Sequence, residues 1–179
     1  MSDKTQDTAI IVYPERNWAE AALAELHGLE EKGVLNIVDA AVIVRRERDG
    51  KLQLVKKKSS TGKGVAKGGL IGLLLAVVVG GPVGVLAGAG AIVGGLFGRK
   101  HAHSADELKQ LLDEKLDNQS SALAVVIDSA DWQTVYDHGI RHGGEIVRLQ
   151  LSAESRTQLE EIAEDPDVLA ATAAQIEVE

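Results

Sequence analysis

The chain has 179 residues, no cysteine, 3% aromatic residues and a formal net charge of −8 at pH 7. This length suits one domain with an insertion better than two separate domains. Without cysteine, disulfides, thiolate catalysis and Cys-ligated metal centres are excluded. The acidic charge argues against nucleic acid as a partner, because phosphates need a basic face and bases need aromatic stacking platforms. The polar start of the chain lacks the pattern of a secretory signal, so export is not expected.

Residues 1–58 are predicted to form the first half of an α/β domain. The β-branched run TAIIVYP predicts a buried strand that Pro14 ends. Asn17 and Glu20 form a capping-box pair at the start of a helix that Gly33 closes. The stretch LNIVDAAVIVRRERDGKLQLVKKK then predicts a β-hairpin, because its Asp-Gly dipeptide is typical of a two-residue type I′ turn.

Residues 104–151 are predicted to form the second half of the domain. A leucine stripe predicts a helix that begins at Ser104, and the continuous apolar run SSALAVVIDS predicts a central strand buried on both faces. An additional α-β unit follows, with a helix over residues 131–142 that Gly143 and Gly144 cap and the strand EIVRLQLS.

Residues 152–179 are predicted to form an acidic tail of two short helices, with the final IEVE unstructured. The order β-α-β-β-insert-α-β is that of an α+β, ferredoxin-like sheet. We therefore expect one ferredoxin-like domain that is interrupted after its hairpin.

The insert, residues 59–103, is rich in glycine and apolar residues. It is not a phosphate-binding loop, because a Walker sequence needs a glycine where Lys57 stands and a Ser or Thr where Gly64 stands. Small residues recur every four positions, which on a helix makes a glycine zipper that lets two backbones pack closely. The zipper residues are Gly64, Gly68, Gly72, Ala76, Gly80, Gly84 and Gly88, continued after a two-residue shift by Gly90, Gly94 and Gly98.

The length of the apolar segment limits how it can meet a membrane. Residues 68–98 are too short for two full crossings at about 20 residues each. Gly81 and Pro82 offer a break at the middle, which favours a helical hairpin that dips into the bilayer. A single span stays open, because the four-residue step continues across Pro82, and so does burial of the hairpin between protein subunits. Basic residues bracket the segment, as at a membrane surface: Lys56, Lys57, Lys58, Lys63, Lys67, Arg99 and Lys100.

The sequence resembles a widespread bacterial family of uncharacterised predicted membrane proteins that are often associated with stress responses. The matching stretches are VYPERNWAEAAL, DAAVIVRRERDGKLQL, GGLIGLLLAVVVGGPVGVLAGAGAIVGGLFG and SSALAVVI, within residues 9–151. The resemblance implies a small α/β domain interrupted by a Gly-rich apolar hairpin. It implies no catalytic residues.

No chemical site emerges from the residue pattern. His138 and His142 share a helix face at a spacing that can bind metal, but they lie in the last turn of a helix, where cations are common, and no third ligand is near in sequence. Ser129 belongs to no nucleophile motif, and the acidic tail lacks a calcium loop. We therefore expect neither an enzyme nor a cofactor or metal.

The predicted function is a non-enzymatic, homo-oligomeric structural or stress-related protein that assembles and anchors through the zipper hairpin. Its expected place is the cytoplasmic face of the inner membrane, with lipid and further copies of itself as partners. One alternative is a soluble cytoplasmic filament or shell with the hairpin buried between subunits. A small-ligand sensor is a second alternative, resting on fold analogy alone.

Overall fold

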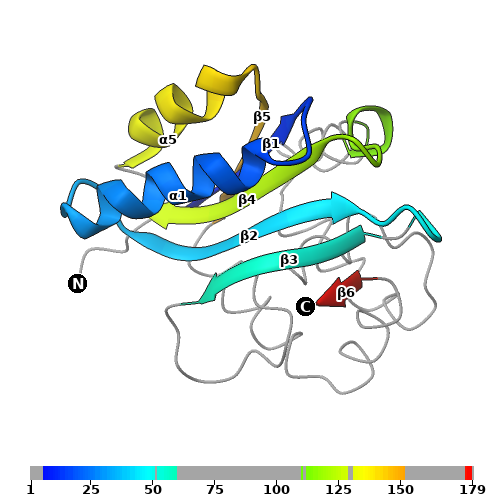
Figure 1. Cartoon of the computed structure of the whole chain (residues 1–179). Coiled ribbons are helices and arrows are strands. Elements are labelled where there is room, and N and C mark those ends of the chain that lie inside the picture. Colours follow the sequence, from blue (N-terminus) through cyan, green and yellow to red (C-terminus); the bar gives the residue numbers. More distant parts are fainter. Residues whose placement is uncertain are drawn as a thin grey trace.

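The computed structural model describes residues 6–50, 52–59, 110, 112–128, 131–151 and 176–178, which form a six-stranded sheet with two helices, α1 and α5, on one face (Figure 1). The strands are β1 (Gln6–Tyr13), β2 (Ile37–Arg45), β3 (Leu52–Ser59), β4 (Ser121–Asp128), β5 (Glu145–Leu151) and β6 (Ile176–Val178). The helices are α1 (Trp18–Glu31), α5 (Trp132–Gly139) and the short 3-10 helix η3 (Ile140–His142), and residues 112–115 are also helical.

The sheet has the strand order β5-β1-β4-β2-β3-β6. Strands β1 to β5 pair antiparallel, whereas β6 runs parallel to β3. Strand β4 follows the insert in sequence but lies between β1 and β2, which precede the insert. The prediction of a mixed α and β domain built on an antiparallel sheet is confirmed.

Strands β1 and β4, which pair with each other inside the sheet, are buried almost along their whole length. Every residue of β1 is buried, and so is every residue of β4 except Asp128. Their apolar runs do not alternate with polar residues, which is the pattern of strands covered on both faces. The prediction of a central strand at SSALAVVIDS is confirmed, and β1 ends at Tyr13, directly before Pro14, as predicted.

Helices α1 and α5 lie on the same face of the sheet (Figure 1). Alternate residues of β1, β2 and β4 point to this face and form one apolar cluster with the buried sides of the two helices. Its central members are Ala9, Ile11, Tyr13, Ala22, Leu26, Val42, Leu123, Val125 and Val135. On the other face Ile10, Ile43 and Leu54 are also buried, as are Leu112 and Leu116.

The N-terminus of α1 is capped from another strand, not by its own residues. Asn17 occupies the N-cap position but its side chain makes no hydrogen bond to the helix, so the predicted cap by Asn17 is wrong. Instead Ser121 Oγ accepts the Ala19 N–H at 3.1 Å and donates to the Glu15 carbonyl at 2.6 Å. The first residue of β4 thus satisfies a free amide of α1.

The connection between β2 and β3 is longer than predicted. The hairpin is confirmed, but Arg45 pairs with Leu52, so six residues separate the strands and not two. The Gly50 N–H donates to the Arg46 carbonyl at 2.8 Å, and the Arg46 guanidinium binds the Asp49 carboxylate. This ion pair and the positive φ of Gly50, 68°, stabilise a wide turn in place of the expected type I′ turn.

The end of the chain is ordered, contrary to the expectation for IEVE. Ile176, Glu177 and Val178 form β6 and pair with Leu52, Gln53 and Leu54 of β3. The β-branched residues at positions 176 and 178 favour a strand. The predicted tail helices of residues 152–175 lie outside the described residues.

Two glycines of the connection from α5 to β5 have different roles. Gly143 adopts a left-handed conformation, with φ of 72°, and ends η3 as predicted. Gly144 is required for space: a Cβ there would lie 2.5 Å from Ile11 Cγ2 and 2.6 Å from the Gly139 carbonyl oxygen. The chain at Gly144 therefore passes directly against the Ile11 side chain of β1 and the backbone at the end of α5.

We expect Gly144→Ala to lower the free energy of unfolding by about 2–3 kcal/mol, because the added methyl group overpacks a site whose neighbours include backbone. The matched control is Gly28→Ala in α1, where a Cβ meets no atom within 4 Å. This control should stabilise by about 0.5–1 kcal/mol, since alanine is the better helix former. Urea denaturation followed by circular dichroism measures both, and equal values for the two variants would contradict the packing.

Candidate functional site

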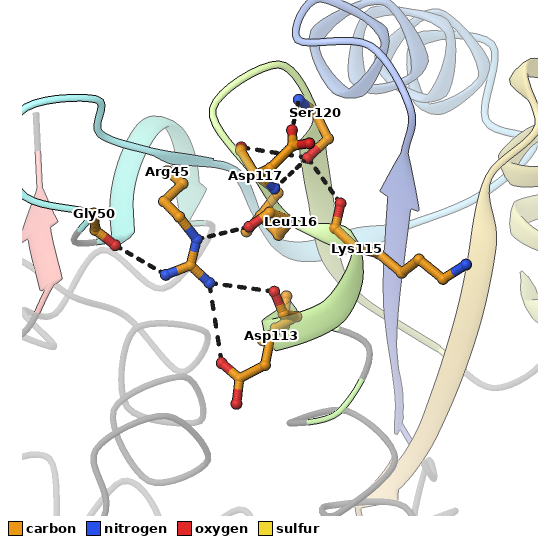
Figure 2. Close-up of polar contacts among 8 residues, drawn as sticks. Arg45, Gly50, Asp113, Lys115, Leu116, Asp117 and Ser120 are labelled. Carbon is orange, nitrogen blue, oxygen red and sulfur yellow. Dashed lines mark hydrogen bonds and ion pairs between the residues drawn. The ribbon is translucent and has the colours of Figure 1, made fainter.

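The candidate site is the junction where the chain returns from the insert to the sheet. The return segment, residues 112–120, connects helical residues to the start of β4 and lies beside the end of β2 (Figure 2). Leu112 and Leu116 are buried at 0% and 2% exposure, as the leucine stripe predicted for a core-facing helix. The predicted start of this helix at Ser104 lies outside the described residues.

Arg45, the last residue of β2, holds the return segment through backbone oxygens (Figure 2). Its Nε donates to the Leu116 carbonyl at 2.6 Å and its Nη2 to the Leu112 carbonyl at 3.2 Å. Its Nη1 donates to the Gly50 carbonyl at 2.9 Å, and the Asp113 carboxylate lies 4.0 Å from Nη2. One guanidinium therefore connects β2, the hairpin turn and the return segment.

The choice of arginine follows from the chemistry of a helix end. Carbonyls at the end of a helix carry partial negative charge, so a cation with several N–H donors is favourable there, beside the Leu116 N–H that the Leu112 carbonyl also accepts at 3.2 Å. A guanidinium offers five donors in a fixed plane, whereas lysine offers one compact ammonium. Arg45 is 26% exposed at its side chain, so these charged hydrogen bonds are only partly screened by solvent.

A second arginine and a tight turn complete the junction. Arg16 Nη1, from the residues before α1, donates to the Asn118 carbonyl at 2.7 Å. Asp117 Oδ1 accepts the N–H groups of Gln119 and Ser120, each at 2.8 Å, and Ser120 Oγ donates to the Lys115 carbonyl at 2.9 Å.

These backbone hydrogen bonds from Gln119 and Ser120 lower the pKa of Asp117. Because the pKa of Asp117 is lower in the folded protein than in the unfolded chain, the ionised carboxylate stabilises the turn at pH values above the usual pKa of aspartate. It loses that stabilisation as the pH falls through the lowered value.

The predicted basic flank is only partly within the described residues. Lys56, Lys57 and Lys58 belong to β3, where they pair with Val42, Ala41 and Ala40 of β2. The remaining flank residues, Lys63, Lys67, Arg99 and Lys100, and the whole zipper from Gly64 to Gly98 with the break at Gly81 and Pro82, lie outside the described residues.

His138 and His142 do meet a third polar group, which the spacing in sequence did not reveal. Glu25 of α1 lies between them, with Oε2 at 3.4 Å from His138 Nδ1 and Oε1 at 3.2 Å from His142 Nε2. Partial burial raises the pKa of Glu25, but the hydrogen bonds to His142 and His138 outweigh it and lower that pKa overall. Only the packing of α1 against α5 brings these residues together. The one available signal was that Glu25 lies on the α1 face next to buried Ala22 and Leu26.

A buried ion pair ties β1 to β5. Asp7 is fully buried, and Arg148 Nη2 donates to its Oδ2. The Arg148 guanidinium also lies 4.4 Å from the ring centroid of Trp132, a cation–π contact. In sequence Asp7 belongs to a polar stretch that gave no sign of burial.

The described residues contain no group of three or more His, Asp or Glu side chains that could hold a metal ion. The part of the chain with described structure also contains no helix long and apolar enough to cross a membrane. The junction itself offers carbonyls, guanidinium groups and carboxylates, which suits it to holding two chain segments together.

The fold and junction define an α/β domain with an antiparallel sheet that is interrupted by a long insertion. A scan against protein families matches residues 62–164 to a family described as protein of unknown function, DUF1269. The chain belongs to this family. The match includes the insert from residue 62 onward, the return segment and β4 to β5, whereas Arg45 and Arg16 lie before it. Searches of curated proteins and of solved structures found no significant match.

We expect Arg45→Met to lower the free energy of unfolding by about 2 kcal/mol, because three carbonyl oxygens lose a charged donor while the aliphatic stem is kept. Arg48→Met is the matched control, since Arg48 is an exposed arginine of the same turn. Hydrogen exchange should locate the loss at residues 112–120. A variant whose return segment exchanges as slowly as the wild type would contradict the junction's role.

Proposed function

We propose that this protein is a non-enzymatic structural protein that attaches to a membrane and assembles with copies of itself through the glycine-rich insert. The observation that carries the proposal is that both ends of the insert join one sheet. Strand β3 leads into the insert, the return segment and β4 follow it, and β2 pairs with both β3 and β4. The insert therefore leaves a folded domain and returns to that same domain.

The two attachment points lie at opposite ends of β2. Ser59, the last residue of β3, pairs with Asp39 near the start of β2, whereas Leu112 is bound by Arg45 at its end. Six residues of strand at about 3.3 Å each place these points roughly 20 Å apart. This separation is wide enough for two helices side by side, whose axes need about 8–10 Å.

The topology favours a hairpin over a single span. Because the sheet cannot be divided between two sides of a bilayer, a segment that enters lipid from it must come back to the same side. Two arms of about 13–16 residues are each roughly 20–24 Å long, less than the 30 Å of a hydrocarbon core. A hairpin that dips into the membrane next to the basic flank fits these lengths, with the α/β domain on the cytoplasmic face.

The finer fold assignment is also part of the proposal, and its strands differ from the predicted ones. The prediction counted β3 as a strand of the ferredoxin-like unit and α5 with β5 as an additional unit, whereas β3 lies outside β2 and does not pair with β1. We propose that β1, α1, β2, β4, α5 and β5 form the ferredoxin-like unit, which the sheet order β5-β1-β4-β2 supports. In this interpretation β3, the insert and the return segment together replace a short β-hairpin connection between β2 and β4. The insertion point is then a loop of the fold, where long insertions cost little.

Flotation on lipid vesicles tests the membrane part of this proposal. We expect the full chain to float with vesicles that contain anionic lipid, and to stay bound in high salt, because apolar burial is not screened by ions. A chain that lacks residues 68–98 but keeps the circular dichroism of the sheet should not float. Sedimentation of the intact protein as a large particle without lipid would instead support the soluble filament or shell.

The assembly part is tested by the zipper itself. Gly84→Leu should reduce the oligomer to smaller species, because a bulky side chain separates helices that pack through their backbones. Val85→Leu is the matched control, since position 85 is predicted to lie off the small-residue stripe. Analytical ultracentrifugation in detergent measures the mass, and an unchanged mass for Gly84→Leu would exclude the zipper as the assembly contact.

A further inference from the structure

We infer that Glu25, His138 and His142 form a proton-dependent link between the two helices that cover the sheet. Glu25 comes from the middle of α1, His138 from the last turn of α5 and His142 from η3. The carboxylate uses one oxygen for each imidazole, at 3.4 Å and 3.2 Å. The Glu25 side chain therefore connects α1 to both α5 and η3.

The distances fit a contact that protonation strengthens. Bonds between an imidazolium and a carboxylate are shorter, about 2.7–2.9 Å, so both present contacts can tighten. The side chains are partly shielded, with exposures of 17% for His138, 30% for His142 and 39% for Glu25. They can thus exchange protons with solvent and still interact more strongly than fully exposed charges.

Two aromatic rings lie beside His142. The centroid of its ring lies 5.8 Å from that of Trp18 and 6.4 Å from that of Tyr13, the latter in an edge arrangement. Tyr13 is the titratable residue that β1 brings to the cluster, and burial, with a smaller contribution from the charge of Glu25, raises the pKa of its hydroxyl. Tyr13 therefore stays neutral and adds no competing charge.

The other charged residues of the packed elements are engaged elsewhere or exposed. On β5, Glu145 pairs with Lys115 and Arg148 with Asp7. On η3, Arg141 is exposed, and on α5 the exposed Asp137 accepts a hydrogen bond from Gln133 Nε2 at 2.8 Å.

The elements beneath α1 leave the cluster without a second acid. On β2, Arg45 is bound to the return segment, and Asp39 does not belong to the apolar cluster between the sheet and the two helices. On β4, Asp128 follows the last strand residue of that cluster, Ile127. Along α1 the residues one turn from Glu25 are uncharged, being Ala21, Ala22, Gly28 and Leu29.

The link is strongest when both sides are charged. The usual pKa of glutamate is 4.5 and that of Glu25 is lowered, so its carboxylate contributes stability above 4.5 and loses it as the pH falls through the lowered value. A neutral imidazole has to take up a proton before it can pair as a cation with this carboxylate. The attraction between α1 and α5 is therefore greatest when the imidazoles are protonated and the carboxylate is still ionised.

The test compares the pH dependence of stability in the full chain. Between pH about 8 and pH about 5.5, the unfolding constant of the wild type should fall about two- to fivefold more than that of Glu25→Gln. The double variant His138→Gln with His142→Gln should match Glu25→Gln. Glu31→Gln, an exposed acid of the same helix, should behave as the wild type. Two results would overturn the inference. One is a Glu25→Gln variant that is destabilised equally at both pH values, and the other is a Glu25→Gln variant whose unfolding constant depends on pH as that of the wild type does.

Discussion

The structure depends on the pairing of β4 with two strands that come before the insert. Its backbone bonds to β1 on one side and to β2 on the other, so it closes the sheet across the whole interruption. Ser121, its first residue, also caps α1 from 102 residues away in sequence. Contacts between residues so far apart in sequence offset the entropy cost of closing the loop only when many of them form together. The buried, uninterrupted apolar run of β4 provides that cooperation.

Strong apolar periodicity explains why the strands and helices were predictable. The signals that predicted them are local, since each acts on residues adjacent in sequence. They are the apolar runs of β1 and β4, Pro14 after β1 and Gly33 after α1. The cap of α1 was missed because Asn17 looks like a suitable cap, while the side chain that bonds there belongs to a distant strand. The hairpin turn was missed because the Arg46–Asp49 ion pair favours a wider loop.

The candidate sites were less predictable than the fold, since each joins residues far apart in the chain. In the sequence Arg45 is one of several charged residues near a turn, and its neighbours give no indication that it binds the carbonyls of residues 112 and 116. Glu25 meets two histidines only through the packing of two helices. The glycine spacing, by contrast, is visible in the sequence, and the function that it serves depends on whether lipid or other protein subunits surround the segment.

The two tryptophans of the chain each lie against a basic side chain at a different place in the domain. Trp18 lies 5.8 Å from the imidazole of His142, and Trp132 lies 4.4 Å from the guanidinium of Arg148. Indole emission responds to nearby charge and to contact with a protonated imidazole. The protein therefore carries two intrinsic fluorescent reporters, one on the contact between its helices and one on the ion pair between β1 and β5. Replacing either indole with phenylalanine would leave the other as a single optical probe without any added label.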